Sequence, residues 1–493
     1  MSAFLVDLQS ISSELILTFF ALFILLVNIF IPEEKRRIIV YLSSLGIFGS
    51  FIILFLQPQS ETIFLGSLSI DKFSLFFKAV ILIGTFLVIL ISVRFFEHEE
   101  FHRGEYYFFL LLTTVGLMFM VSAVDLISLY VSFELMAISC YILAGFLKKD
   151  LRSNEAGMKY FILGTFSSGI FLFGLSFLFG LTGSTSFQKI GQVLSQTGVN
   201  PILILTMLVL ASALFFKIAA VPFHMWIPDV YEGAPTPVTA YLSVAPKAAC
   251  FAIFIRLFLE TLPVIKVEWQ TLIAWVALIT MTYGNIAALT QKSVKRMFAY
   301  SSIAHAGYLL IGLAAGGEFG LWGMLYYLLV YTFMNIGAFS IILFLKKTKS
   351  TTNYQLPITK NGGQFGENID DFNGLAQKAP LLSAIIVIIL LSLTGIPPTG
   401  GFISKLYIFS AAINQKLYWL AVAGVLNSVV SLYYYFRLGM AIYFKDPDKE
   451  VKYSPSRALI LALTIIGLAI LVLGIYPRPF VWLAKTSIVN FIN

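Results

Sequence analysis

The sequence predicts an all-α, polytopic membrane protein with about fourteen transmembrane helices. Of its 493 residues, 59% are hydrophobic and only 12% are charged, whereas about 25% of the residues in a soluble domain are charged. Runs of roughly 18 or more mostly apolar residues recur along the whole chain, and each can cross a hydrocarbon layer about 30 Å thick. These runs leave no room for a sizeable soluble domain.

The expected spans follow one another with short connections, and each ends where its apolar run ends. They lie at 12–32, 37–56, 72–95, 106–123, 125–147, 156–182, 201–220, 236–260, 269–289, 297–315, 319–345, 380–415, 417–443 and 455–475. The first run, LILTFFALFILLVNIFI, lacks a basic leading segment and a small-residue cleavage site. We therefore interpret it as a retained helix rather than a signal peptide.

Two of the spans are interrupted by proline and glycine. The seventh runs into KIAAVPFHMWIPDVYEGAPTPV at 217–238, and the twelfth contains GIPPTGG at 395–401. A proline removes a backbone donor and frees a carbonyl one turn earlier, and such groups are tolerated at membrane depth only beside protein or water. The sequence therefore predicts two broken helices, each beside a polar, hydratable pocket.

The broken helices occupy similar places in two sets of five spans, 4–8 and 9–13. Because five is an odd number, the second set would be inverted relative to the first, an arrangement typical of transporters. We predict four units: N-terminal helices 1–3 in 1–105, a first inverted repeat (helices 4–8) in 106–262, a second (helices 9–13) in 263–445, and helix 14 in 446–493.

Lysine and arginine gather in alternate loops. These loops include EEKRR, FLKKDLR, QKSVKR, KKTKS and FKDPDKEVKYSPSR. Since basic loops favour the cytoplasmic side, we expect both termini on the outer, periplasmic side and the 346–379 loop in the cytoplasm.

Six titratable side chains fall within or at the ends of apolar spans, and an ionised side chain at mid-membrane costs at least about 2.5–3.5 kcal/mol. They are Glu134, Lys159, Lys217, Lys247, His305 and Lys405, in spans 5, 6, 7, 8, 10 and 12. A metal-ion site would favour clustered carboxylates and carbonyls, so one acid and several bases do not suit a cation pocket. They suit a lateral chain of protonatable groups bridged by water.

Glu134 and Lys217 are the central pair of this hypothesis. Burial disfavours the charged form of a lysine and a nearby carboxylate favours it, so a lysine with a movable carboxylate partner can load and release a proton. Other interpretations stay open: Glu134 as a buried, protonated acid, Lys159 as a lysine that snorkels to the interface, and His305 as a hydrogen-bonding residue rather than a proton relay.

Four further residues have weaker interpretations. Lys78 and Arg437 are expected to snorkel. His224 and Asp229, in the first broken segment, are interpreted equally well as gating residues or as loop-stabilising ones.

No sequence signal indicates a cofactor in this chain. Cys140 and Cys250 lie in apolar runs and are interpreted as packing residues, without a disulfide or metal site. We find no Gly-rich phosphate motif, no cysteine cluster for iron–sulfur and no histidine pair for haem. The net charge of +8 indicates basic loops rather than a nucleic-acid partner. The chain is expected to be powered by an ion gradient or by a partner.

Three long stretches carry a family resemblance. FKIAAVPFHMWIPDVYEGAPTPVTAYLSVAPKAA, VKRMFAYSSIAHAGY and LLSLTGIPPTGGFISKLYIF together resemble the antiporter-like, proton-conducting membrane subunits of respiratory complex I, NADH:quinone oxidoreductase. DVYEGAPTPVTAYLSVAPKAA is most similar to the branch called subunit N. The resemblance covers roughly residues 100–440.

The resemblance implies a role for each buried charge. Glu134 and Lys217 match the glutamate and lysine partners of helices 5 and 7, and Lys159 matches the helix 6 lysine that modulates them. The remaining matches are Lys247 as the connecting lysine of helix 8, His305 as the central histidine of helix 10 and Lys405 as the terminal lysine of helix 12.

The resemblance also implies a setting for the chain. Such subunits belong to a translocase enzyme that couples electron transfer from NADH to quinone, performed in other subunits, to proton pumping. FMN, iron–sulfur clusters and quinone are then expected in partner subunits and not in this chain. Expected partners are the lipid bilayer, the antiporter-like sibling M and small subunits such as A, J and K, in a bacterial inner membrane. The rivals are an Mrp-type cation/proton antiporter subunit and a purely structural subunit.

Overall fold

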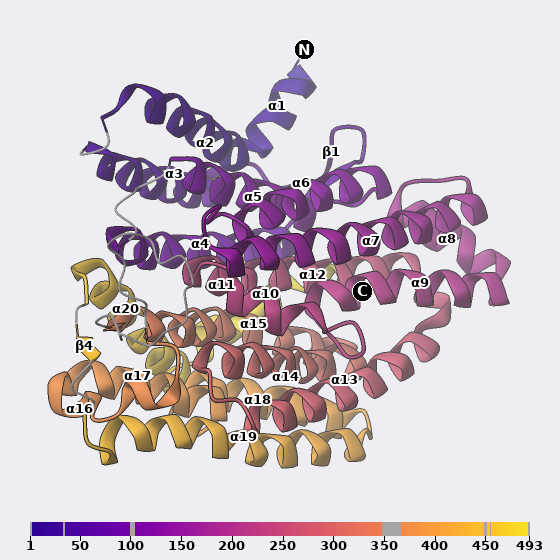
Figure 1. The fold of residues 1–493 in the computed structure, drawn as a ribbon. Helices are drawn as coiled ribbons and strands as arrows, with labels where there is room; N and C mark the ends of the chain where they lie inside the picture. The colour runs from indigo at the N-terminus through magenta and orange to yellow at the C-terminus, as the bar shows by residue number, and fades with distance from the viewer. Residues whose placement is uncertain are drawn as a thin grey trace.

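The computed structural model describes residues 2–32, 35–98, 104–347, 366–447, 451–453 and 455–491. Figure 1 shows long helices stacked side by side, with the N-terminal helices at one end of the array. In the described residues, thirteen helical segments are long and apolar enough to cross a membrane, and the predicted all-α membrane fold is confirmed. One further crossing is shared by α17 (Pro380–Thr394) and α18 (Gly400–Asn414), each too short to span alone. Residues 348–365 of the expected cytoplasmic loop lie outside the described residues.

The N-terminal unit contains three spans and a hairpin that the sequence analysis missed. Its elements are α1 (Ser2–Ser10), α2 (Ser12–Phe30), α3 (Arg37–Leu56), the antiparallel strands β1 (Ser60–Ile63) and β2 (Leu68–Ile70), and α4 (Lys72–His98). The hairpin turns through Phe64, Leu65 and Gly66, all with positive φ.

The next set of elements contains the first break. It comprises α5 (Gly104–Ser122), α6 (Leu126–Ala144), α7 (Leu151–Thr182), the connecting helix α8 (Phe187–Thr197), α9 (Pro201–Ile218), α10 (Trp226–Gly233), α11 (Thr236–Leu242), α12 (Ala245–Arg256) and the π-helical turn η2 (Leu257–Thr261). Side-chain caps set several starts: Asp125 accepts from two backbone amides at the start of α6, and Asn200 accepts from one at the start of α9.

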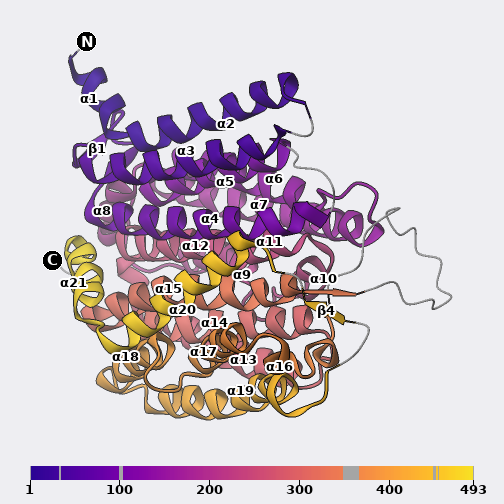
Figure 2. The same cartoon turned by 90° about the vertical axis from the view of Figure 1, so that its left-hand side faces the viewer.

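The last set contains the second break. It comprises η3 (Pro263–Ile265), α13 (Lys266–Leu289), α14 (Val294–Ala315), α15 (Gly317–Ser340), η4 (Ile341–Phe344), β3 (Leu345–Lys347), η5 (Ile369–Phe372), α16 (Leu375–Lys378), α17, α18, α19 (Tyr418–Phe444), β4 (Val451–Tyr453), α20 (Arg457–Ile475), α21 (Arg478–Ser487) and η6 (Val489–Phe491). Strands β3 and β4 pair antiparallel. Figure 2 shows the C-terminal α20 running back across the array to α21, which lies at the same edge as α1. Helix α15 is enclosed by α4, α11, α14, α18 and α20, and every residue from Gly320 to Ser340 is buried.

The two predicted breaks end in the same way. Helix α9 stops at Ala219 and α17 at Gly395, and both residues have positive φ (59° and 91°). In each case the amide of the following residue donates to the carbonyl five positions earlier, at 2.9 and 3.0 Å. This is the closing bond of a Schellman motif, in which a left-handed residue ends a helix. The shared pattern makes Ala219 and Gly395 equivalent positions.

From the sequence, Lys405 beside the second break would mirror Lys217 beside the first, and this equivalence corrects that interpretation. Lys217 stands two residues before Ala219, a position that Leu393 holds before Gly395. Lys405 stands ten residues after Gly395, and its counterpart is Asp229. The two lysines therefore lie on opposite sides of their breaks, one on the half-helix before and the other on the half-helix after.

The eighth crossing contains a break that was not predicted. Helix α11 ends at Leu242, and α12 begins at Ala245 with Pro246 in its first turn. Val244, between them, has φ −123° and ψ −69°, which are not helical values. Proline suits a first turn because its missing N–H has no helical partner there. The break places Lys247 in the first turn of α12.

The prediction that Lys78 reaches the interface is wrong. Its side chain is fully buried in α4, and its Nζ lies 2.6 Å from Oε1 of Glu14, which is equally buried on α2. Ser13 donates its hydroxyl to the other carboxylate oxygen at 2.8 Å. An acid on a neighbouring helix therefore takes the place of water as the partner of this lysine.

Single and double substitutions of this pair should differ sharply. Lys78→Met leaves a buried carboxylate without its cation and should destabilise the fold by about 3–5 kcal/mol. Glu14→Leu combined with Lys78→Met removes both charges and should be nearly neutral. Thermal unfolding of the detergent-purified chain measures the difference. A double variant as unstable as the single one would contradict the expectation.

Candidate functional site

Four of the six predicted site residues lie deep in the molecule. Lys217 on α9, Lys247 on α12, His305 on α14 and Lys405 on α18 expose between 1% and 4% of their surface. None of the four points into lipid, so the central part of the predicted line is enclosed by protein. Glu134 on α6 and Lys159 on α7 are only partly buried.

Lys217 is surrounded by aromatic rings rather than by a carboxylate. Its Nζ lies 4.7 Å from the ring centroid of Phe133, 5.3 Å from that of Tyr141 and 5.8 Å from that of Tyr160. It also donates to the Tyr141 hydroxyl at 3.4 Å. A desolvated cation–π contact is worth about 2 kcal/mol, so several of them offset part of the cost of burying the ammonium group. This arrangement accounts for a lysine at membrane depth.

The expected ion pair between Glu134 and Lys217 is not formed in the described structure. The Glu134 side chain is partly exposed on α6, and its buried Oε1 has no hydrogen-bond partner among the described residues. The rings of Phe133 and Tyr141, on the same helix, lie against Lys217 instead. The expectation was wrong in geometry because the sequence identifies the two helices but not the face of α6 that meets α9.

Lys159 is tied to the first broken segment. Its Nζ lies 2.7 Å from Asp229 on α10 and 2.7 Å from Glu155 one turn earlier. Arg296 on α14 approaches the other oxygen of Asp229 at 3.5 Å and Glu232 at 2.8 Å. The Lys159 side chain is 40% exposed, so these are surface ion pairs of modest strength. Asp229 therefore bridges α7 and α14, which favours a role in holding the broken segment.

Lys247 and His305 are joined to buried hydroxyl groups. Lys247 donates to the hydroxyl of Ser302 at 2.6 Å and to its carbonyl at 2.9 Å. Ser302 in turn shares a hydrogen bond of 2.9 Å with the Tyr331 hydroxyl. His305, one turn after Ser302 on α14, has Nδ1 2.7 Å from the hydroxyl of Tyr327. Lys247 and His305 thus each have a hydroxyl group within hydrogen-bond distance with which they can exchange a proton.

The other side of His305 leads toward Lys405. Its Nε2 lies 3.3 Å from the hydroxyl of Tyr435 on α19, which also bonds Ser301. Its ring centroid is 5.6 Å from that of Tyr308, and Lys405 Nζ lies 4.6 Å from the Tyr308 centroid. The imidazole is therefore placed between the two buried lysines.

Lys405 closes the end of α17. Its Nζ donates to the carbonyls of Leu393 at 3.1 Å and Thr394 at 2.8 Å. These carbonyls have no helical partners because the helix ends there, and the helix dipole makes this end electronegative. The predicted polar pocket beside the second break is thus formed by freed carbonyls and occupied by the lysine.

Lys217 and Lys247 have different hydrogen-bond partners. No described side chain makes a hydrogen bond to both. Trp226 stacks on Tyr160 at 4.5 Å and meets Tyr231 edge-on at 5.9 Å. The Tyr231 hydroxyl is buried without a protein partner among the described residues, and such groups are normally satisfied by ordered water. This is the interval where the water-bridged relay predicted from the sequence needs solvent.

Sequence reasoning missed the tyrosines of the site. Tyr308, Tyr327, Tyr331 and Tyr435 are all fully buried around His305. A signal was present: Tyr308 is three residues from His305, and Tyr327 and Tyr331 are four apart, so each pair shares a helix face.

Removal of one hydroxyl tests the relay without disturbing packing. Tyr327→Phe deletes the group 2.7 Å from His305 Nδ1 and should slow proton transport several-fold with the fold unchanged. Tyr326→Phe is a matched control, because the neighbouring Tyr326 hydroxyl is equally buried but donates to the Leu473 carbonyl at 2.5 Å. Proton transport in membrane vesicles is the measurement. Equal losses in both variants would contradict a relay role for Tyr327.

The described residues contain no group of three or more His, Cys, Asp or Glu side chains that could hold a metal ion. Cys140 and Cys250 are buried and unpaired. Cys250 donates its thiol to the Leu214 carbonyl at 3.6 Å, in keeping with a packing role. That the chain holds no cofactor stays a prediction.

Comparisons with known proteins agree with this geometry. The model of the family described as NADH:quinone oxidoreductase/Mrp antiporter, TM, matches residues 123–431, which contain all six predicted site residues. NADH-quinone oxidoreductase subunit N of Trichlorobacter lovleyi is 42% identical over 98% of this chain and 97% of its own length. The subunit N of Moorella thermoacetica is 39% identical over 98% of this chain and 99% of its own.

Solved structures show the same fold. A chain of respiratory complex I from Thermus thermophilus is 28% identical, covers 96% of this chain and 99% of its own length, and has a TM-score of 0.79. A chain of the Mrp complex from Dietzia covers 99% of this chain and 98% of its own length, with a TM-score of 0.84. Because it is only 18% identical, it supports the fold alone. By sequence and by fold, this chain belongs to the NADH:quinone oxidoreductase/Mrp antiporter family of membrane subunits.

Proposed function

We propose that this chain is a proton-translocating subunit of the membrane arm of NADH:quinone oxidoreductase. One observation carries the proposal: a buried row of three lysines and a histidine runs between two broken helices, and Lys217, Lys247 and His305 each have a hydroxyl group within hydrogen-bond distance. Relatives that match nearly the whole chain are named as subunits of that oxidoreductase. As such a subunit the chain takes part in a translocating enzyme.

Each residue has a task that follows from its contacts. Lys217, held by aromatic rings, takes up a proton, and a change in the charge of Glu134 alters how firmly it holds that proton. Lys247 passes a proton to the Ser302 hydroxyl as that hydroxyl gives its own onward. His305 accepts and returns a proton between tyrosine hydroxyls, and Lys405 at the second break releases it. Asp229 holds Lys159 and thereby influences the first break.

The energy source lies outside this chain in the proposal. FMN, iron–sulfur clusters and quinone would be held by partner subunits, where electrons pass from NADH to quinone. The likeness to a complex I chain supports partners within such a complex in general. We further propose the sibling M and small subunits such as A, J and K as the neighbours.

The chain is an integral, multi-pass membrane protein. We propose the bacterial inner membrane as its location, with both termini on the periplasmic side. The described basic residues Lys148, Arg152 and Lys292 support this orientation, because they lie at the opposite ends of the helices from the termini.

An Mrp-type cation/proton antiporter subunit is the second candidate, because the matching family model is described as covering Mrp antiporters as well as NADH:quinone oxidoreductase. A direct comparison separates the two functions. Inside-out vesicles that contain the assembled complex should acidify internally when NADH and a quinone are added. The purified chain alone in liposomes should not exchange Na⁺ or K⁺ for protons. Cation exchange by the isolated chain, without NADH-driven acidification, would instead establish the antiporter.

A further inference from the structure

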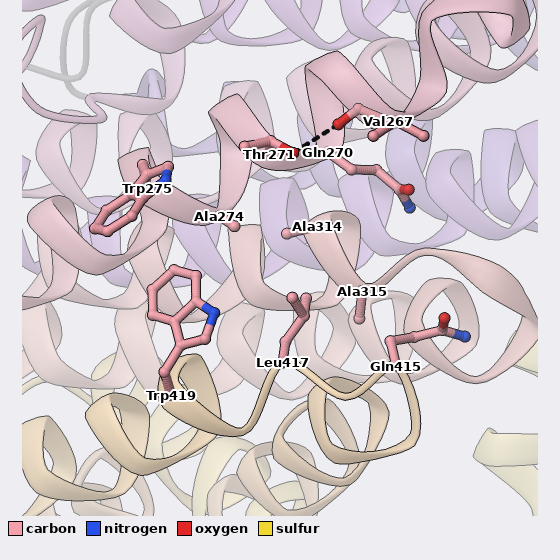
Figure 3. A pocket seen from close by; sticks show the side chains of 10 residues that line it. All are labelled: Val267, Gln270, Thr271, Ala274, Trp275, Ala314, Ala315, Gln415, Leu417 and Trp419. Carbon is pink, nitrogen blue, oxygen red and sulfur yellow. Dashed lines mark hydrogen bonds between the residues drawn. The ribbon is translucent and has the colours of Figure 1, made fainter.

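A cavity of about 370 Å³ opens at the side of the molecule, away from the buried line. It lies where α13 begins, α14 ends and α18 turns into α19 (Figure 3). Ala274, Ala314 and Ala315 form its floor, and their small side chains leave the hollow unfilled. Its volume falls within the range of about 300–1,000 Å³ that is typical of small-molecule sites.

The cavity lies at the edge of the hydrocarbon layer. Helix α13 has 24 residues and is therefore about 36 Å long, so part of it extends beyond a hydrocarbon layer about 30 Å thick. Trp275 and Trp419 face each other at one end of the cavity, with ring centroids 5.0 Å apart and about half of each side chain exposed (Figure 3). Exposed tryptophans concentrate at membrane–water interfaces.

The other end of the cavity is polar. Figure 3 shows the amide groups of Gln270 and Gln415 at this end, apart from the tryptophans. Both amides approach the Gly316–Gly317 turn, where a Cβ on Gly316 would clash with Nε2 of Gln270. Both glycines have positive φ, which favours glycine, and the missing side chain of Gly316 leaves room for the Gln270 amide. No described residue makes a hydrogen bond to either side-chain amide, so both can donate to a ligand.

Charge at this end favours an anion of low charge. Lys266 is exposed one helical turn before Gln270 and shares its face, and Lys416 is exposed directly after Gln415. Glu268, next to Val267, and Glu318, after the glycine turn, are also exposed. Because two carboxylates accompany the two ammonium groups, this end suits a singly charged phosphodiester better than a multiply charged free phosphate.

We propose that this cavity binds one glycerophospholipid. The phosphodiester accepts hydrogen bonds from the amides of Gln270 and Gln415 and lies near the two lysines. One acyl chain follows the alanine floor and passes between Trp275 and Trp419 into the hydrocarbon layer. The polar end, the apolar floor and the interfacial position each match one part of such a molecule.

Three probes separate the parts of this ligand. The full-length chain, purified in detergent and stripped of lipid, is titrated with dioleoylphosphatidylglycerol and followed by native mass spectrometry. One phospholipid should bind. Dioleoylglycerol, which has the chains without the phosphate, and glycerol phosphate, which has the headgroup without chains, should each bind at least about tenfold more weakly. Equal binding of dioleoylglycerol would overturn the proposal, because it would indicate an apolar groove only.

Substitutions place the binding at this cavity. Lys416→Gln should weaken phospholipid binding about fivefold, since a lysine near a membrane surface contributes about that much. Lys189→Gln, an exposed lysine on α8, is the matched control and should have no effect. Ala274→Leu fills the floor and should abolish binding, with thermal unfolding as a check on its fold. Equal binding by wild type and Lys416→Gln, or an equal loss in Lys189→Gln, would overturn the assignment.

Discussion

Replacing Lys217 with alanine is expected to reduce NADH-driven proton transport at least about tenfold, within the range that positioned acid–base groups contribute. The side chain is 3% exposed, and its ammonium group lies over three aromatic rings with one hydroxyl acceptor. No other lysine or histidine contacts these rings in the described structure. Without Lys217 the line therefore loses its first base. Acidification of inside-out vesicles measures the effect, and native electrophoresis checks assembly.

Two further variants at this position separate charge from proton exchange. Lys217→Arg keeps a positive charge but cannot release its proton, and Lys217→Met keeps much of the side-chain volume without a charge. Both should fail to transport protons if the group must load and release one. Lys189→Ala, on the surface of α8, should transport normally. Full transport by the arginine variant would show that only a fixed charge is needed, and full transport by the methionine variant would leave Lys217 without a role.

Gly401→Ala is expected to prevent stable folding of the second break, at a cost above about 4 kcal/mol. A Cβ at Gly401 would overlap the carbonyl oxygen of Ser392, the residue that also accepts a hydrogen bond from the Gly401 amide at 3.1 Å. The obstacle is backbone rather than a flexible side chain, so relief requires α17 and α18 to move apart. Lys405, one turn along α18, would then lose its carbonyl partners.

The same substitution at Gly439 is the control for this effect. Gly439 lies inside α19, and a Cβ there meets nothing within 4 Å. Gly439→Ala should therefore be neutral or raise stability by up to about 1 kcal/mol, because alanine favours a helix over glycine. The yield of monodisperse protein and its thermal unfolding compare the two variants. A Gly401→Ala variant as stable as Gly439→Ala would contradict the prediction, because it would mean that α17 and α18 can move apart without loss of stability.

Much of the fold could be predicted because hydrocarbon length and backbone satisfaction constrain membrane helices strongly. The apolar runs, the breaks at Pro222 and Pro398 and the buried basic residues can all be read directly from the sequence. The partners of the buried charges were harder to predict. Lys78 pairs with Glu14 on α2, and Glu134 does not reach Lys217. Both outcomes depend on how the helices are rotated against one another. A hydropathy profile locates each helix in the sequence but does not give its rotation about its own axis.

The hydroxyl groups of the site show a second reason why part of the site could not be predicted from the sequence. Ser302 and Tyr331 give no distinct signal in composition, because the chain has 23 tyrosines and serine recurs in many of its apolar runs. Their role comes from α14 and α15 lying side by side, a packing relation between helices. The break before Lys247 was missed because Pro246, in the middle of the predicted 236–260 span, could also have kinked the helix without ending it. The φ and ψ of Val244 show the interruption.

The short helix α10 has one more consequence. It packs against α7 of the first predicted five-helix set and against α14 of the second, and Asp229 on it is paired with a cation on each. A tilt of α10 that lengthens one of these contacts would also shift the other, so a movement beside α7 can be passed to α14. Displacement at the first discontinuity is thus expected to reach the histidine-bearing helix as a rigid-body movement, which would make the whole chain switch as one cooperative unit.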